Sequence, residues 1–179
     1  MHGMATAAAA LSVCEDFGQD RLAARAKGVL ADAWAAFDVS LAPAGVDLAL
    51  SALPVALSVG DAVLAAELRA AATRCALAAA RGGRMDRGDG VEAGPSMPRR
   101  ASLKTGASGP AEAGMSEGDA RELLQRALRW ASMACDDWES AECVGDAADA
   151  ARLAALVSRV LRDCGDGVHL PVGRGGGTV

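Results

Sequence analysis

The sequence predicts an all-α fold: an antiparallel helical bundle of five or six helices, interrupted by a disordered insertion. Alanine, the best helix former, is the most frequent residue of the 179, and 51% of residues are hydrophobic. Aromatic residues make up only 3%, too few to fill the faces of a β-sandwich or barrel. A net charge of −5 with this apolar content also excludes a chain that is disordered throughout.

Residues 5–81 form the predicted N-terminal half of the bundle. One long helical pattern covers 5–37, with weak points at Gly18 and Gly28, because glycine costs a helix about 1 kcal/mol relative to alanine. Pro43 then opens a second helix that ends near Ser58. The predicted buried stripes of these helices are Leu22, Ala26, Val29, Leu30, Ala33 and Phe37, and then Val46, Leu50, Leu53 and Leu57.

A third helix is expected from Gly60-Asp61 to about Ala80, ended by Gly82-Gly83. Its predicted face is Val63, Leu64, Leu68, Ala71, Ala72 and Cys75. Residues 82–118 then hold Gly, Pro, Ser and mixed charge with few large apolar groups. Such a segment cannot bury enough surface to offset the entropy of ordering it, so we expect a disordered insertion.

Residues 119–164 complete the same bundle, and 165–179 form a flexible Gly-rich tail. Ser116 is the expected helix cap, followed by a stripe through Leu124 and Leu128. We expect a connector at Asp136-Asp137, a new helix start at Trp138, and a last helix over 147–164. The predicted core leucines are Leu53, Leu68, Leu128 and Leu156.

Charge and cysteine content limit the function classes. A pI near 5.0 argues against nucleic acid as a partner, because phosphate binding needs a basic surface. Five cysteines without a Cys-x-x-Cys pair favour buried thiols in a reducing, cytoplasmic environment over a disulfide or zinc framework. The longest uncharged run beyond the N-terminus is short and holds Pro54, so no integral membrane segment is expected.

No residue set predicts catalytic, cofactor-binding or metal sites. Both histidines, His2 and His169, lie near the ends of the chain, far from any positioned nucleophile. The segment 173–177 hints at an RNA-binding repeat, but it occurs once. Four acids could form a cation or basic-partner site, although charge at a helix start explains them as well: Asp136, Asp137, Glu139 and Glu142.

Two short features point to partners. Two arginines precede Ser102 and Leu103 follows it, which is typical of substrates of basophilic kinases, so Ser102 is the phosphorylation candidate. Trp34, Trp130 and Trp138 either fill an Ala/Leu core or anchor a partner. Trp138, with its neighbours Asp137 and Glu139, is the partner-binding candidate because it combines a large apolar surface with flanking charge.

The order of these features resembles the C-terminal helical domain shared by the large outer-coat subunit of COPII vesicles and the steroid receptor RNA activator protein. The matching residues are Asp20-Arg21-Leu22, Ser40-Leu41-Ala42-Pro43, Leu50, Leu53, Ala56, Leu57, Gly60-Asp61, Ala65-Ala66, Asp137-Trp138-Glu139 and Leu153 to Leu161. The insertion at 82–118, extra residues between Glu142 and Ala151, and a missing second Trp in the closing helix depart from that family. The resemblance implies a helical interaction module without catalytic residues.

We therefore expect a non-enzymatic protein–protein interaction or scaffold module of the vesicle-coat kind, associated with membranes only through a coat and needing no cofactor. The alternative is a small helical enzyme or ligand-binding protein whose site the sequence does not reveal. A pocket that gathers titratable groups would favour the alternative, and an apolar groove on a charged surface would favour the module.

Overall fold

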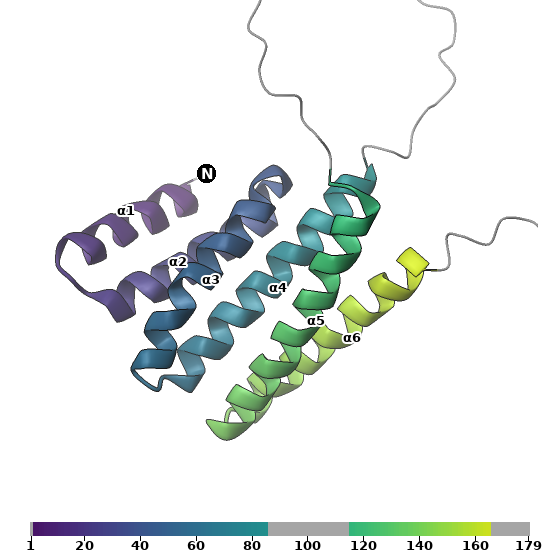
Figure 1. Ribbon diagram of the computed structural model, residues 1–179. Coiled ribbons are helices and arrows are strands. Elements are labelled where there is room, and N and C mark those ends of the chain that lie inside the picture. The colour runs from purple at the N-terminus through teal and green to yellow at the C-terminus, as the bar shows by residue number, and fades with distance from the viewer. Residues whose placement is uncertain (1, 86–114, 166–179) are drawn as a thin grey trace, which may run out of the picture.

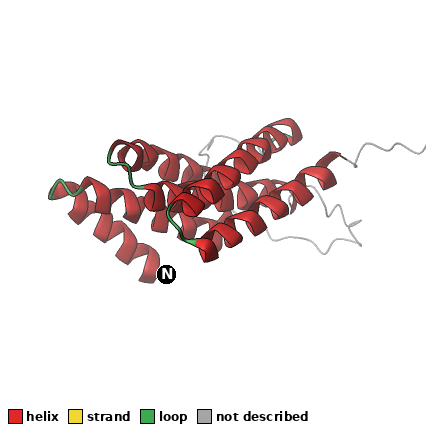
Figure 2. Cartoon of the chain, turned by 90° about the horizontal axis from the view of Figure 1, so that it is seen from below, coloured by secondary structure: helices red, strands yellow, loops and turns green. Residues whose placement is uncertain are grey.

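The fold is all-α and antiparallel, as predicted (Figure 1). The computed structural model describes residues 2–85 and 115–165, with side chains for 5–82 and 115–164. These residues contain helices joined by short loops and no strand (Figure 2). The helices are α1 (His2–Asp16), α2 (Asp20–Phe37), the 3-10 helix η1 (Val39–Leu41), α3 (Ala42–Ser58), α4 (Ala62–Met85), α5 (Glu117–Ser140) and α6 (Val144–Gly165).

The six α-helices form a row of three hairpins, α1 with α2, α3 with α4, and α5 with α6 (Figure 1). Each helix packs on its neighbours in sequence. In addition, α2 and α6 both contact α4, but they do not contact each other. Helix α4 is therefore the centre of the bundle, and α1 and α6 are its two edges.

The expected long pattern over 5–37 is divided into two helices, so that prediction is wrong at Gly18. Gly18 has φ +62, a left-handed conformation that glycine adopts without steric cost. The chain reverses there: the Gln19 N–H donates to the Cys14 carbonyl at 2.8 Å, and α1 folds back on α2. Lys27 and Glu15 join the two helices at 3.2 Å.

Helices α2 and α3 bury small residues more than the predicted leucine stripes. Leu22, Val29 and Phe37 are 55%, 57% and 80% exposed, and Leu57 is 55% exposed. The buried residues are Ala23, Ala24, Gly28, Leu30 and Ala31 in α2, and Ala42, Gly45, Val46, Ala49, Ala52 and Ala56 in α3. The bounds of α3 match the prediction, and the helix continues through Pro54.

Helix α4 begins as predicted and ends later. Gly60 has φ +66, and the Asp61 carboxylate accepts the Leu64 N–H at 3.0 Å, which caps the first turn. The predicted end at Gly82-Gly83 is wrong, because the helix continues to Met85. Only the ends of the expected insertion, 82–85 and 115–118, are described; 86–114 lies outside the described residues, as does 166–179.

Small residues allow α4 to approach its neighbours closely. A Cβ at Gly45 would lie 2.7 Å from the Cys75 Sγ, and one at Gly28 would lie 3.1 Å from a methyl of Leu68. The Cys75 thiol donates to the Ala31 carbonyl at 3.2 Å. Burial raises the pKa of Cys75 to about 12, so this thiol stays protonated.

Helix α5 starts at the predicted cap and runs past the predicted connector. The Ser116 hydroxyl accepts the Asp119 N–H at 3.1 Å. The expected helix start at Trp138 is wrong, because Trp138 lies inside α5 and the chain turns at Glu142, which has φ +60. Of the predicted core leucines, Leu68 is fully buried; Leu53, Leu128 and Leu156 are partly buried and pack against the core.

Replacing Gly45 with alanine should destabilise the fold. The added methyl would collide with Cys75, and overpacking costs roughly 1–3 kcal/mol, more than the gain of about 1 kcal/mol from helix propensity. We expect the free energy of unfolding in urea to fall by about 1 kcal/mol. A Cβ at Gly145 meets open space, so Gly145→Ala should leave stability unchanged or raise it. Equal effects of both substitutions would contradict close packing at Gly45.

Candidate functional site

A groove runs along α4, which forms its floor, with α2 as the wall on one side and α6, together with Trp138 of α5, as the wall on the other. At the Asp61 end only α2 and α4 line it. It consists of four adjoining pockets with volumes of about 410, 360, 310 and 550 Å³. Arg74 of α4 lines three of them, so it lies near the middle of the groove. The groove exists because α2 and α6 contact the same helix without contacting each other.

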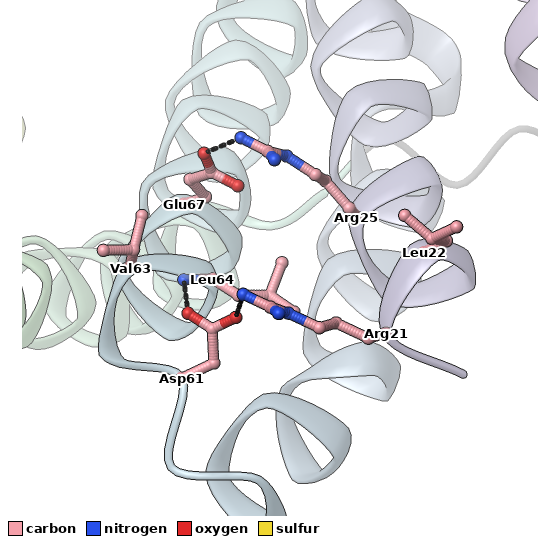
Figure 3. Close-up of a pocket in the computed structure, with 7 residues that line it drawn as sticks. All are labelled: Arg21, Leu22, Arg25, Asp61, Val63, Leu64 and Glu67. Atoms are coloured by element: carbon pink, nitrogen blue, oxygen red, sulfur yellow. Dashed lines mark hydrogen bonds and ion pairs between the residues drawn. The ribbon is translucent and has the colours of Figure 1, made fainter. Parts of the chain in front are cut away.

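Ion pairs join the α2 wall to the floor (Figure 3). Arg21 lies 2.5 Å from Asp61, and Arg25 lies 2.8 Å from Glu67. Further along, the Nε and Nη2 atoms of Arg74 hold the two oxygens of Asp32 at 2.7 and 2.6 Å. Exposed pairs such as these add at most about 1 kcal/mol each. The partners advance together along both helices, so α2 and α4 are parallel.

Asp61 is held as a carboxylate at one end of the groove. The hydrogen bond from the Leu64 N–H lowers its pKa most; burial acts in the opposite direction, and Arg21 lowers the pKa further. A carboxyl group held ionised in this way suits a cap and an ion pair better than proton transfer near neutral pH.

The other end of the groove is mainly apolar. Its pocket of about 550 Å³ is lined by Asp32, Ala35, Ala36, Arg74, Leu77, Ala78, Arg81, Leu153 and Leu156. The adjoining pocket is lined by Ala70, Trp138, Ala150 and Leu153 among others. This end can therefore take apolar side chains, with Arg74 and Arg81 beside them.

The structure separates the three predicted partner-binding residues. Trp138 is 8% exposed and packs against small residues of α4, α5 and α6, although it also lines two of the groove pockets. Asp137 pairs with Arg69 inside the bundle, while the exposed Glu139 accepts a weak bond from the Cys135 thiol at 3.6 Å. Trp138 thus fits the core interpretation, with one part of its surface at the groove.

Among the described residues, Arg69 is a charged residue buried in the core. Its side chain is 7% exposed, its Nε has no hydrogen-bond partner, and burial lowers its pKa. Asp137, 25% exposed, supplies the counter-charge. Glu142 lies in the turn just before α6. Asp136, Asp137 and Glu139 instead lie at the end of α5, so their interpretation as helix-start charge is wrong. At this end the helix dipole disfavours them, and Arg69 compensates Asp137.

Other predicted features are placed as follows. Ser102, with its kinase motif, lies outside the described residues, as do His169 and 173–177. His2 is the first residue of α1, and its side chain is not described. None of the five cysteines, all of which lie within the described residues, forms a disulfide. In the ranges 5–82 and 115–164, no three His, Cys, Asp or Glu side chains gather as metal ligands.

Sequence reasoning did not identify Arg74 and Leu77 as groove residues, and it predicted Leu156 only as part of the core. Arg74 is the one charged residue in the sequence from Ala70 to Ala80. Its isolated charge was the feature of the sequence that could have indicated a functional position. The position of α2 and α6 on either side of α4 depends on contacts between residues far apart in sequence. Local periodicity does not predict such contacts.

No protein family, curated protein or solved structure matches this chain. One described segment, Val39–Ser58, has the length and mean hydropathy, 1.6, of a membrane-crossing helix. Core helices share these properties, and α3 packs its alanine face against α2 and α4, so this is weak evidence for a membrane span.

Removing Asp137 should cost more stability than removing Arg69. Asp137→Ala leaves the guanidinium buried without a counter-ion, and we expect a loss of about 3 kcal/mol in urea unfolding. Arg69→Met should cost clearly less, because methionine fills the apolar space and Asp137 can be hydrated. A larger loss for Arg69→Met would show that packing, and not burial of charge, dominates this contact.

The Asp61 ion pair should make stability fall in acid. The folded state lowers the pKa of Asp61 below its ordinary value of 3.8. The ionised carboxylate therefore stabilises the fold above pH 3.8, and this stabilisation is lost as the pH falls through the lower pKa of the folded state. Asp61→Asn keeps a capping side chain but removes the charge, so its melting temperature should drop less than the parent's between about pH 5 and about pH 3. Asp47→Asn, at an exposed position of α3, is the control and should behave as the parent.

Proposed function

We propose that the protein is a non-enzymatic interaction module that binds a segment of a partner protein in the groove between α2, α4 and α6. The observation that carries this proposal is the groove itself, an open channel whose two walls share a floor but do not touch. Grooves between helices are a common way of recognising peptide segments.

The dimensions of the groove favour a peptide over a metabolite. Its floor runs from Asp61 to Arg81, which at roughly 1.5 Å per residue is about 30 Å of helix. A small-molecule site would instead enclose its ligand in one concave cavity. Apolar side chains at one end and charged side chains along the α2 wall provide both anchoring and orientation.

The state of the charged side chains supports binding over catalysis. Arg21, Arg25 and Arg74 each form an ion pair between α2 and α4, and the lowered pKa of Asp61 keeps its carboxyl group ionised. The resemblance to the vesicle-coat domain predicts the same kind of role in the cytoplasm, with membrane association through a coat, and that context stays a prediction. So does the phosphorylation of Ser102.

The alternative is a small helical enzyme or a ligand-binding protein. This groove is also the candidate site for that alternative, because Arg21, Arg25, Asp61 and Glu67 line one of its pockets and Asp32, Arg74 and Asp146 line the next. A metabolite that raised the melting temperature of the purified protein at micromolar concentration would favour this alternative over the interaction module.

A single charge placed in the groove should abolish partner binding. Ala36 is exposed and lines the apolar pocket, so Ala36→Glu should leave the fold intact while placing a carboxylate where apolar side chains dock. Ala155 is also exposed in a helix but lines none of the four pockets, so Ala155→Glu is the matched control.

The measurement is quantitative capture of cross-linked partners by the parent and by both variants, with circular dichroism to verify folding. We expect at least one protein to bind the parent and Ala155→Glu equally, and Ala36→Glu at least about tenfold less, as for loss of an interface hot spot. If every captured protein bound all three chains equally, the groove would not be the interaction site.

A further inference from the structure

The groove is walled by helices, and this limits what can occupy it. Backbone N–H and C=O groups inside α2, α4 and α6 are already bonded within each helix, so they offer nothing to an extended peptide. A helix satisfies its own backbone groups and needs only apolar contacts and side-chain pairing. The groove therefore suits a helical occupant lying over α4 between α2 and α6.

The two ends of the groove differ in the charged side chains that have no ion-pair partner among the described residues. Asp146 of α6 lines the pocket that also contains Leu64 and Leu68, and no described side chain pairs with it. Arg81 lines the apolar pocket at the other end, likewise without a described partner. One end therefore presents an unpaired carboxylate and the other an unpaired guanidinium.

These two charges fix the length and direction of a complementary helix. Leu64 and Leu68, beside Asp146, lie about 20–25 Å along α4 from Arg81, a span of roughly 13–17 helical residues. Asp146 would pair with a basic residue of the occupant, and Arg81 with an acidic one. Helices favour acids in their first turn and basic residues in their last turn. The ion pairs and the helix-dipole preferences are satisfied together only if the N-terminal turn of the occupant, which is acidic, lies at Arg81.

The three groove helices run in the same direction. The ion pairs advance together along α2 and α4, and the pockets pair Leu64 and Leu68 with the start of α6 and Leu77 with Leu153 and Leu156. An occupant with its N-terminus at Arg81 therefore runs antiparallel to all three. This is the same relation that α3 and α5 have to α4 on its other sides.

We propose that the partner segment is an amphipathic helix that runs antiparallel to α4, with an acidic N-terminal turn on Arg81 and a basic C-terminal turn on Asp146. This inference rests on the proposed function and adds the chemistry and direction of the partner. The apolar face of the occupant would dock on Ala78, Leu153 and Leu156, which are partly exposed at the apolar end of the groove.

The probe is a displayed library of peptides of roughly 18 residues with a fixed apolar stripe at helical spacing. Its end positions are randomised among Lys, Glu and Ser. The full-length protein is the bait. We expect selected peptides to be acidic in the first turn and basic in the last, and exchange of the two ends of the best binder should weaken binding at least tenfold.

Charge reversal of the groove gives the decisive comparison. The double variant Asp146→Lys with Arg81→Glu should lose at least tenfold in affinity for the selected peptide and should bind the end-exchanged peptide as tightly as the parent binds the original. The matched control, Asp47→Lys with Arg121→Glu, alters exposed charges that line none of the four pockets and should change neither affinity.

The outcomes separate this inference from the proposed function. If the selected peptides showed no charge preference at their ends and yet failed to bind the Ala36→Glu variant, that result would overturn the inference and leave the groove as the interaction site. Failure of the double variant to bind the end-exchanged peptide would overturn the direction assigned here. If no peptide is selected, or if the selected peptides bind Ala36→Glu normally, both proposals fall.

Discussion

The close approach of α4 to its neighbours through small side chains is the constraint on which the rest of the structure depends. Ala and Gly line the contacts of α2 and α3 with α4, and Gly45 faces Cys75 without room for a methyl group. Dispersion attraction requires such contact, so a chain poor in aromatic residues can still form a dense core when its backbones lie close together. The low aromatic content and the high alanine content are thus two aspects of one packing solution.

The same constraint explains the largely buried ion pair between Arg69 and Asp137. Near Arg69 the core between α4 and α5 consists of Ala66, Ala70, Ala134 and similar small residues, which resist sliding only weakly. Arg69 and Asp137 join these two helices in one register, and a shift of either helix would leave the guanidinium buried without its counter-charge. Trp138, one residue further along α5, fills the space that small residues leave beside this pair.

Three helix starts were predicted correctly from the sequence, whereas the predicted buried face of the first helical pattern was largely wrong. Pro43, Gly60-Asp61 and Ser116 mark helix starts through local chemistry, and the structure has helices beginning at or beside each of them. Faces were predicted from Leu, Val and Phe, but Leu22 and Phe37 are exposed because the alanines next to them allow a closer contact. Trp138 was mistaken for a helix start because Asp136 and Asp137 resemble a cap, whereas their partner, Arg69, is remote in sequence. The groove could not be predicted, since it depends on which helices share α4.

The arrangement of hairpins links this packing to a binding role. Helix α4 is surrounded by α2, α3, α5 and α6, but α2 and α6 remain apart, so one side of the central helix is left without a covering helix. A closed bundle would have brought these two helices together and covered Ala78 and Leu156, which are partly exposed here. Here the ion pairs between α2 and α4 hold one wall in place, and the leucines of α6 form part of the other, so the groove is formed before any partner arrives. A site formed in advance does not have to be ordered on binding, so more of the contact energy is available for affinity.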